Sequence, residues 1–233
     1  MVDDDEVVKD AVRSGLNLYG YNVCTASNGV EALAQLEYQL PALILLDIAM
    51  PGMDGVELCS IIREDTRWNS LPIIFLTGNT ELKQKITAYT VGGDDYLCKP
   101  FDIHELNLRI KAVLRRSTIP NQQQDESEIE DTSYRLNVGG LRLDIHSAAV
   151  ETEKGIAYLT PTELILLRYL MQHPNQLFSS EHLLEKVWEY PPRTGDPALV
   201  RWHMKNLRLK IEAEPDQPRF LQTVPHHGYI LRI

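Results

Sequence analysis

Two short apolar runs, each closed by a polar residue, constrain most strongly how this chain can fold. They occupy residues 42–47 (Ala-Leu-Ile-Leu-Leu-Asp) and 72–77 (Pro-Ile-Ile-Phe-Leu-Thr). Runs of this length that are apolar at every position are typical of strands buried on both faces. Segments with helical spacing alternate with them, so the first half of the chain predicts an α/β fold with a doubly wound parallel sheet. We expect further strands over 21–27 and 95–98, and helices over 29–38, 56–64, 81–90 and 103–116.

A polar, acidic segment divides the chain in two. Residues 117–132 carry five acidic side chains and no basic one, which is typical of a flexible linker. We therefore predict a first domain over 1–116, a linker over 117–132 and a second domain over 133–233. The net charge of −10 belongs to the first domain and the linker, because the second domain has 12 basic and 11 acidic side chains. The overall acidity thus does not exclude nucleic acid as a partner of the second domain.

The second region has a different pattern, in which short strands precede helices. Alternating runs cover 141–145, 149–151 and 156–159, and a hairpin is expected around 223–231. Three helices lie between them, and Thr160, Pro161 and Glu163 mark the start of the first as a capping box with proline at the first helical position. This order predicts an α+β domain.

Polar side chains gather where the predicted parallel sheet should bind a ligand. In an open α/β sheet, ligands bind beyond the carboxyl ends of the strands, and the sequence places Asp3, Asp4, Asp47, Thr77 and Lys99 there. Asp47 can act as a nucleophile toward phosphorus, and the three carboxylates are the oxygen ligands that Mg²⁺ takes. Lys99 supplies a cation and Thr77 a hydroxyl donor for phosphoryl oxygens. Because phosphoryl transfer depends on positioning and charge neutralisation, this set predicts a Mg²⁺-dependent phosphoryl site.

Taken in order, these motifs resemble the receiver domain of two-component response regulators. The matching stretches are Asp3-Asp4-Asp5, the run from Leu45 to Gly55, Phe75-Leu76-Thr77 and the run from Gly92 to Phe101. The resemblance implies that Asp47 accepts a phosphoryl group from a sensor histidine kinase and that the backbone carbonyl of Ala49 is a further Mg²⁺ ligand. It also implies that Thr77 and Tyr96 act as the switch that reports phosphorylation. A haloacid-dehalogenase-type phosphatase would need an aspartate at position 49 instead.

The segment before the acidic pair departs from the receiver pattern. The family has a buried apolar strand there, and this chain offers Met1 and Val2. That strand normally lies between the strands expected at 21–27 and 42–47, whose backbone groups would otherwise lack partners. We expect that the start codon has been assigned too late and that extra N-terminal residues exist. The alternative is a degenerate receiver whose first strand is largely absent.

The resemblance also implies a surface through which two receivers pair. In the receiver subclass closest to this sequence, the face of the fourth helix, fifth strand and fifth helix forms salt bridges between two copies. By position, Asp95 with Arg109 and Lys85 with Glu105 would lie on this dimer face. Exposed ion pairs contribute only about 0–1 kcal/mol each, so they would specify geometry more than affinity. Ordinary solvated helix charges are the alternative interpretation.

A helix begun by Asp196 and Pro197 concentrates the positive charge of the second region. Four basic residues and no acidic one lie between positions 201 and 210. A basic helix face indicates a nucleic-acid contact, since a helix fits the major groove of double-stranded DNA. A solvated basic face is the alternative. The face opposite the expected core stripe of Val200, Met204, Leu207 and Ile211 carries Arg201, Trp202, Lys205, Asn206, Arg208 and Leu209.

Residues 134–233 resemble the winged-helix output domain of the OmpR/PhoB class. The resemblance implies that the basic helix enters the major groove, that the terminal hairpin reaches the minor groove, and that the loop 189–196 contacts RNA polymerase. His203 is either a phosphate contact or a core residue. The wing tip has His226 and His227 where the class has a basic residue, so a phosphate contact there is lost or depends on pH. The matching stretches are Leu159–Glu163, Leu183–Trp188, Val200–Arg208, Arg219–Val224 and Gly228-Tyr229.

Together these expectations predict a phosphorylation-controlled transcriptional regulator. Phosphorylation of Asp47 would favour a homodimer and place two winged helices on adjacent DNA half-sites. The alternative is a DNA-binding or protein-interaction regulator that works without phosphorylation. Neither would be an enzyme that turns over a substrate. The three cysteines lack metal-ligand spacing, and the chain has neither a signal segment nor an apolar run of membrane length, which favours a cytoplasmic protein without a membrane partner.

Overall fold

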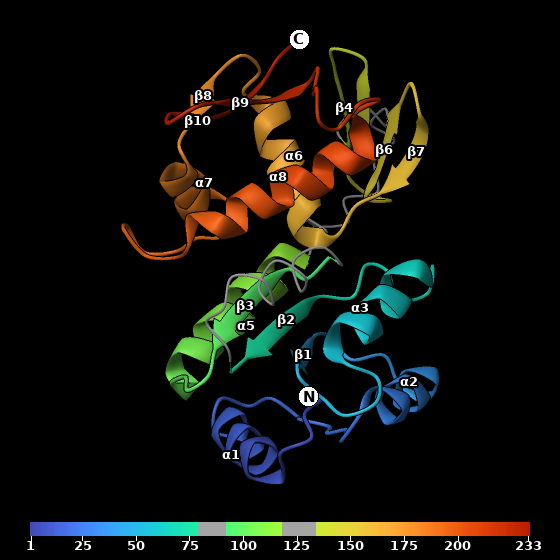
Figure 1. Ribbon diagram of the computed structural model, residues 1–233, viewed down its shortest axis with the longest axis vertical. Helices are drawn as coiled ribbons and strands as arrows, with labels where there is room; N and C mark the ends of the chain where they lie inside the picture. Colours follow the sequence, from blue (N-terminus) through green and yellow to red (C-terminus); the bar gives the residue numbers. More distant parts are fainter. Residues whose placement is uncertain (79–91, 118–133) are drawn as a thin grey trace, which may run out of the picture. The chain divides into compact units, whose positions relative to one another are not determined.

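The computed structural model describes residues 1–78, 92–117 and 134–233, which fall into two units, Met1–Leu114 and Arg115–Ile233 (Figure 1). The helix predicted over 81–90, and the predicted linker beyond Ser117, lie outside the described residues. The first region contains α1 (Glu6–Asn17), α2 (Gly29–Tyr38), β1 (Ile44–Asp47), α3 (Gly55–Glu64), β2 (Ile73–Thr77), β3 (Asp95–Cys98) and α5 (Ile103–Ser117).

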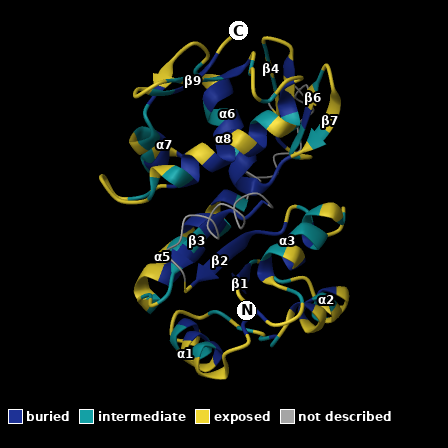
Figure 2. Ribbon diagram, in the orientation of Figure 1, coloured by how far each residue is buried: buried dark blue, intermediate teal, exposed yellow. Residues whose placement is uncertain are grey.

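The strands β1, β2 and β3 form a parallel sheet in that order. Its register pairs Asp47 with Leu76 and Thr77 with Cys98, so the carboxyl ends of the three strands lie at one edge. Every residue of β1 and β2 is buried, as expected for strands covered on both faces (Figure 2). The parallel α/β sheet predicted from the apolar runs is therefore confirmed.

Helices cover both faces of this sheet. One core cluster joins Leu46 to Leu58 of α3 and to residues of α2, and a second joins Leu45 to Leu16 of α1 and Ile110 of α5. Successive side chains of a strand point to opposite faces, so the neighbouring leucines of β1 serve different cores. This arrangement explains why β1 and β2 carry no polar residue before their last position.

The residues that precede α1 lie beside β1. Val2 forms isolated parallel bridges to Leu46 on one side and to Ala26 on the other. The strand predicted over 21–27 is wrong, because within that segment the structure assigns a bridge to Ala26 and no strand. An extended segment becomes a strand through hydrogen bonds to a neighbour, and here Val2 supplies that neighbour at one position.

The second region contains two antiparallel sheets and, among its described residues, the three predicted helices. Strands β4 (Arg135–Val138), β5 (Leu141–Asp144), β6 (Ala149–Thr152) and β7 (Gly155–Tyr158) form one sheet in this order. They are followed by α6 (Pro161–Gln172), β8 (Leu177–Phe178), α7 (Ser180–Lys186), α8 (Pro197–Ile211), β9 (Leu221–Val224) and β10 (Gly228–Leu231). The second sheet has the order β8-β10-β9, so the predicted α+β order and the C-terminal hairpin are confirmed.

The predicted capping box at the start of α6 is present and also links two helices. Thr160 accepts a hydrogen bond from the backbone N–H of Glu163, and the Glu163 carboxylate accepts one from the backbone N–H of Thr160. The same carboxylate lies 2.6 Å from Nζ of Lys210 near the end of α8. Within the described parts of the chain, no helix is both long and apolar enough to cross a membrane.

Candidate functional site

Three aspartates converge at the carboxyl edge of the parallel sheet. Asp47 is the last residue of β1, and Asp3 and Asp4 directly follow the bridge that Val2 makes beside it. One carboxylate oxygen of each aspartate lies within 4.8 Å of the others. Asp3 and Asp47 are buried, with exposed fractions of 0% and 6%, whereas Asp4 is exposed. The structure thus brings together the three predicted carboxylates, whose oxygens suit a hard cation such as Mg²⁺.

A lysine ammonium bridges two of these carboxylates. Nζ of Lys99, the residue after β3, lies 2.7 Å from Oδ2 of Asp3 and 2.8 Å from Oδ2 of Asp47. The backbone N–H of Lys99 donates to the carbonyl oxygen of Thr77 at 2.7 Å, so the end of β2 fixes where the lysine side chain begins. The parallel sheet therefore brings Lys99 into contact with two aspartates that lie 96 and 52 residues before it in the chain.

Burial and charge act in opposite directions on these groups. Burial raises the pKa of Asp47, and the hydrogen bond from Lys99 opposes that rise. Burial by itself would lower the pKa of Lys99, but the hydrogen bonds to Asp3 and Asp47 leave that pKa above its ordinary value. The lysine therefore stays charged and offsets the repulsion between carboxylates that share a partly buried site.

Hydrogen bonds at the start of α1, which the sequence pattern did not predict, hold Asp3 in place. Asp5 is the N-cap of α1 and accepts hydrogen bonds from the backbone N–H groups of Val7 and Val8. The backbone N–H of Asp5 donates to Oδ1 of Asp3 at 2.9 Å. Each oxygen of Asp3 thus has its own donor, since Lys99 occupies the other. The available sequence signal was an aspartate directly before a helical pattern.

The other predicted residues of the first domain lie around the acidic cluster. Thr77 ends β2 and is buried, and the backbone nitrogen of Ala49 lies 3.4 Å from Oδ1 of Asp47. Tyr96 of β3 pairs with Phe75 and packs partly buried against the core cluster on the α2 and α3 side of the sheet. The predicted switch concerns a movement of Thr77 and Tyr96 and stays a prediction.

The residues predicted to pair two receivers are engaged within one chain. Arg109 lies 3.3 Å from Oδ1 of Asp95 and 2.7 Å from Oε1 of Glu105. Asp95 is buried, so its carboxylate is not available on an open surface in this conformation. Lys85 lies outside the described residues. Salt bridges between two copies therefore stay a prediction.

Helix α8 presents fewer candidate DNA contacts than predicted. Arg201 and Lys205 are exposed, and Arg208 is half-buried. The prediction that Trp202 and Asn206 face outward is wrong, since each is 5% exposed. Together with the buried Leu199, they recur at helical spacing beside the predicted core stripe, so the buried side of α8 is wider than the apolar pattern indicated.

The histidines of the second domain divide into a buried one and an exposed pair. His203 is 1% exposed, and its ring centroid lies 5.2 Å from that of the buried Trp188, which favours the core interpretation over a phosphate contact. His226 and His227 are exposed in the turn between β9 and β10. Nδ1 of His227 lies 2.8 Å from the carbonyl oxygen of Pro225, and because a carbonyl only accepts, this hydrogen bond requires a proton on Nδ1.

Family models match both regions of the chain. The response regulator receiver domain matches residues 1–111, and the C-terminal domain of transcriptional regulatory proteins matches residues 153–231. RpaA of Synechocystis sp., a DNA-binding dual master transcriptional regulator, is 37% identical over 234 residues, which cover 100% of this chain and 94% of RpaA. PhoP of Bacillus subtilis, an alkaline phosphatase synthesis transcriptional regulatory protein, is 37% identical over 99% of this chain and 95% of PhoP. The chain belongs to the OmpR/PhoB class of two-component response regulators.

This response regulator combines a receiver domain with a DNA-binding domain and acts in the regulation of transcription. The transcriptional regulatory protein AfsQ1 of Streptomyces coelicolor is likewise 37% identical over 99% of this chain and 96% of its own length. A solved structure of a RitR mutant has a TM-score of 0.72 and covers 99% of this chain and 96% of its own, which at 23% identity supports the fold. The family predicted from the motifs is thus confirmed.

Proposed function

We propose that Asp47 of this response regulator accepts a phosphoryl group from the phosphohistidine of a sensor kinase. An oxygen of the Asp47 carboxylate attacks phosphorus while the bond between phosphorus and the kinase imidazole breaks, which leaves an acyl phosphate on Asp47. The observation that carries this proposal is the position of Asp47 at the tip of β1, beside both Lys99 and the carboxylates of Asp3 and Asp4. A buried, rigidly held carboxylate beside a fixed cation suits phosphoryl transfer.

The acidic cluster fits a magnesium ion. Asp3, Asp4 and Asp47 would hold it with the backbone carbonyl of Ala49, and carboxylate and carbonyl oxygens are the ligands that Mg²⁺ takes. When bound, the ion supplies positive charge that offsets the charge on the phosphoryl oxygens. Lys99 then holds a phosphoryl oxygen through the ammonium that now lies on Asp47, and the hydroxyl of Thr77 donates to another.

The conformational response would pass from the end of β2 to β3. Thr77 moves toward the phosphoryl group, and Tyr96 on the neighbouring strand turns inward into the space that Thr77 leaves. The face that carries Lys85, Asp95, Glu105 and Arg109 then pairs two receivers. This pairing requires Arg109 to exchange its present contacts with Asp95 and Glu105 for contacts with the second copy.

The second domain would bind double-stranded DNA through α8 and the β9–β10 hairpin. Arg201 and Lys205 are the exposed cations of the helix, and His226 and His227 form the tip of the hairpin. Arg208 joins the two, because it donates to the carbonyl oxygen of Leu221 and to Oγ1 of Thr223. We assign residues 1–116 to the receiver, 117–132 to a linker and 133–233 to the DNA-binding domain. The loop 189–196 would contact RNA polymerase. The protein would act in the cytoplasm.

Phosphate-affinity gel electrophoresis tests the acceptor. The full chain is incubated with acetyl phosphate and Mg²⁺, beside Asp47→Asn, Asp10→Asn and a sample with the metal chelated. Asp10 is an exposed residue of α1 outside the cluster and serves as the matched control. We expect a retarded band for the parent and for Asp10→Asn, and none for Asp47→Asn or without Mg²⁺. A retarded band that persists in Asp47→Asn would overturn the proposal.

A further inference from the structure

Lys9 of α1 is a buried cation that the proposed phosphoryl transfer does not use. Its side chain is 2% exposed, and a lysine is almost never buried this far unless its ammonium is paired. Nζ of Lys9 lies 2.8 Å from Oε1 of Glu6 in the same helix and donates to Oγ of Ser27 at 2.6 Å. Glu6 is 72% exposed, so the buried contact of the ammonium is the one to Ser27, which lies 18 residues further along the chain.

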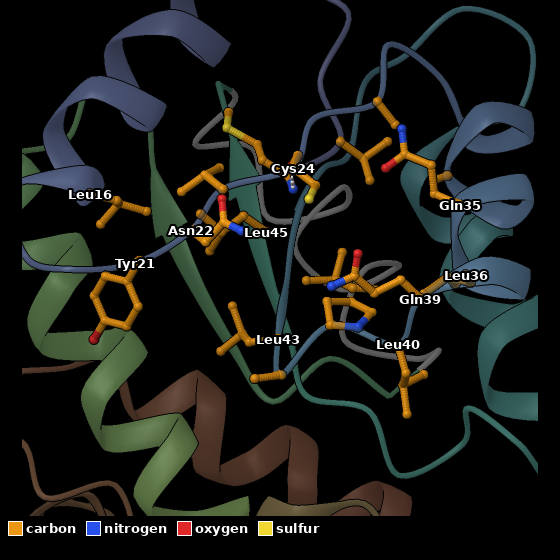
Figure 3. Close-up of a pocket in the computed structure, with 18 of the residues that line it drawn as sticks. Leu16, Tyr21, Asn22, Cys24, Gln35, Leu36, Gln39, Leu40, Leu43 and Leu45 are labelled. Carbon is orange, nitrogen blue, oxygen red and sulfur yellow. Dashed lines mark hydrogen bonds between the residues drawn. The ribbon is translucent and has the colours of Figure 1, made fainter.

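Ser27 belongs to the segment 24–27, which runs between α1 and α2. Figure 3 shows Cys24, the first residue of this segment, with Leu16 of α1 on one side and Gln35 of α2 on the other. Within the segment the structure assigns one bridge and no strand. Side-chain contacts from the neighbouring helices therefore contribute more to its position than they would for a residue in a full ladder of strands.

The same segment holds the backbone that precedes Asp4. The carbonyl oxygen of Ala26 accepts a hydrogen bond from the backbone N–H of Asp3 at 3.1 Å. From there the chain passes through Asp4 into α1, which leads to Lys9 and its contact with Ser27. The stretch that carries Asp4 is thus held to this segment at both ends.

The position of the Asp4 carboxylate depends on that stretch of backbone. Asp3 accepts hydrogen bonds from Lys99 and from the backbone N–H of Asp5, and Asp47 accepts one from Lys99. The Asp4 carboxylate is exposed and, within the described parts of the chain, makes no hydrogen bond or ion pair. Its oxygens therefore lie near the other two aspartates only because the backbone places them there.

We propose that Lys9 is a positioning residue for the magnesium site, which acts through Ser27 to hold the stretch that carries Asp3 and Asp4. This inference rests on the proposed function, since it requires that the acidic cluster binds Mg²⁺. Lys9 itself contacts neither the metal nor the phosphoryl group. Residues that orient metal ligands from outside the coordination shell typically contribute about 10–100-fold to metal affinity.

The charge of Lys9 and its contact with Ser27 have opposite effects on a bound cation. A positive charge near the acidic cluster repels Mg²⁺, so loss of the charge alone would strengthen binding. Loss of the contact with Ser27 would weaken binding, because Asp4 would no longer be held beside the other carboxylates. A purely structural role would lower the Tm of the first unit and leave the Mg²⁺ dissociation constant unchanged. The direction of the change in affinity therefore distinguishes these three roles.

A second contact, one turn further along α1, provides a matched control. The guanidinium of Arg13 donates to Oγ1 of Thr25 at 2.6 Å and so joins the same helix to the same segment. The Arg13 side chain is 41% exposed, against 2% for Lys9. Because this contact is more exposed and lies one helical turn further from Asp4, its loss should affect the position of Asp4 less.

An NMR titration of the full chain with MgCl₂ measures the dissociation constant at a temperature where every variant is folded. We expect Lys9→Met and Ser27→Ala each to weaken Mg²⁺ binding about tenfold. Ser27→Ala removes the contact without changing the charge, at a half-buried position where the fold is retained. The controls Arg13→Met and Thr25→Ala should stay within about twofold of the parent.

Three results would overturn this inference. Lys9→Met and Ser27→Ala could bind Mg²⁺ as tightly as the parent or more tightly, which would leave Lys9 a structural or purely electrostatic role. Equal weakening in the two control variants would mean that Lys9 has no specific part in placing Asp4. A parent chain that binds no Mg²⁺ would overturn the function proposed for the acidic cluster and this inference with it, whereas a parent that binds Mg²⁺ beside unchanged variants would overturn this inference alone.

Discussion

Nζ of Lys99 lies 2.8 Å from Oδ2 of Asp47, and the same ammonium is the charged partner of the fully buried Asp3. The lysine therefore holds together the carboxylates that the proposed function requires. This contact makes the stability of the receiver and its response to a divalent cation depend on one side chain, since both cations would neutralise the same groups.

Replacement of Lys99 by methionine should destabilise the receiver in the absence of metal. The change leaves two buried carboxylates without their cation, which typically costs about 3–5 kcal/mol and here less, because Lys99 is partly exposed. Mg²⁺ should then raise the Tm of Lys99→Met more than that of the parent, because the metal has no ammonium to displace. Thermal unfolding with and without Mg²⁺ measures both effects. Lys111→Met, at an exposed position of α5, is the control, and an equal Mg²⁺ shift in all three proteins would contradict the argument.

Two arginines near the end of α3 should differ sharply in their contribution to stability. Arg63 pairs with the buried Asp94 at 3.2 Å and also donates to the carbonyl oxygens of Gly92, Asn69 and Leu71. Arg63→Met should lower the free energy of unfolding by about 3–5 kcal/mol, because Asp94 stays buried without its cation. Arg67→Met should cost at most about 1 kcal/mol, since its pairs with Glu37 and Asp65 are exposed. Urea unfolding of both variants measures the two losses of stability. Similar unfolding midpoints would contradict the predicted difference between Arg63 and Arg67.

In the second domain, Glu212 at the end of α8 should contribute more to stability than a glutamate near a helix end usually does. Its buried carboxylate accepts hydrogen bonds from the backbone N–H groups of Arg219, Phe220 and Leu221 at 2.7–2.9 Å. Glu212→Ala leaves these donors without a partner and should destabilise the domain by about 3 kcal/mol. The exposed Glu214→Ala serves as the control and should stay within about 0.5 kcal/mol of the parent. A loss below about 1 kcal/mol for Glu212→Ala would show that the loop finds other acceptors.

DNA affinity should depend on the exposed cations of α8. Arg201→Ala and Lys205→Ala should each weaken binding, and loss of a phosphate contact should reduce the slope of log affinity against log salt by about 0.9. Arg142, which pairs with Glu151 on the exposed face of the β4–β7 sheet, provides a control of the same charge. Fluorescence anisotropy over a series of salt concentrations gives both values. Unchanged affinity and slope in both α8 variants would show that this helix face does not contact DNA.

Much of the candidate site could be predicted from the sequence, for a local reason. The apolar runs that end in Asp47 and Thr77 can be buried only as strands of a covered parallel sheet, and the carboxyl ends of such strands meet at one edge. Lys99 follows the next strand and therefore had to lie near both. The capping box at Thr160 was equally predictable, because its two hydrogen bonds join residues three positions apart.

Tertiary structure decided what depends on partners distant in the chain. The sequence of 21–27 is suited to a strand, but strand formation needs a hydrogen-bonded neighbour, and Val2 provides one at Ala26. The helical pattern of α8 located its apolar stripe, yet it could not reveal that Trp202, His203 and Asn206 are also buried, because the width of a buried face is set by what packs against it. The resemblance to receivers implied a contact of Arg109 with Asp95 of a second copy, and only the fold gave it Asp95 and Glu105 of its own chain as partners. The two-residue period of strands and the 3.6-residue period of helices predict which way a side chain points. The residue that it contacts depends on the packing of the whole domain.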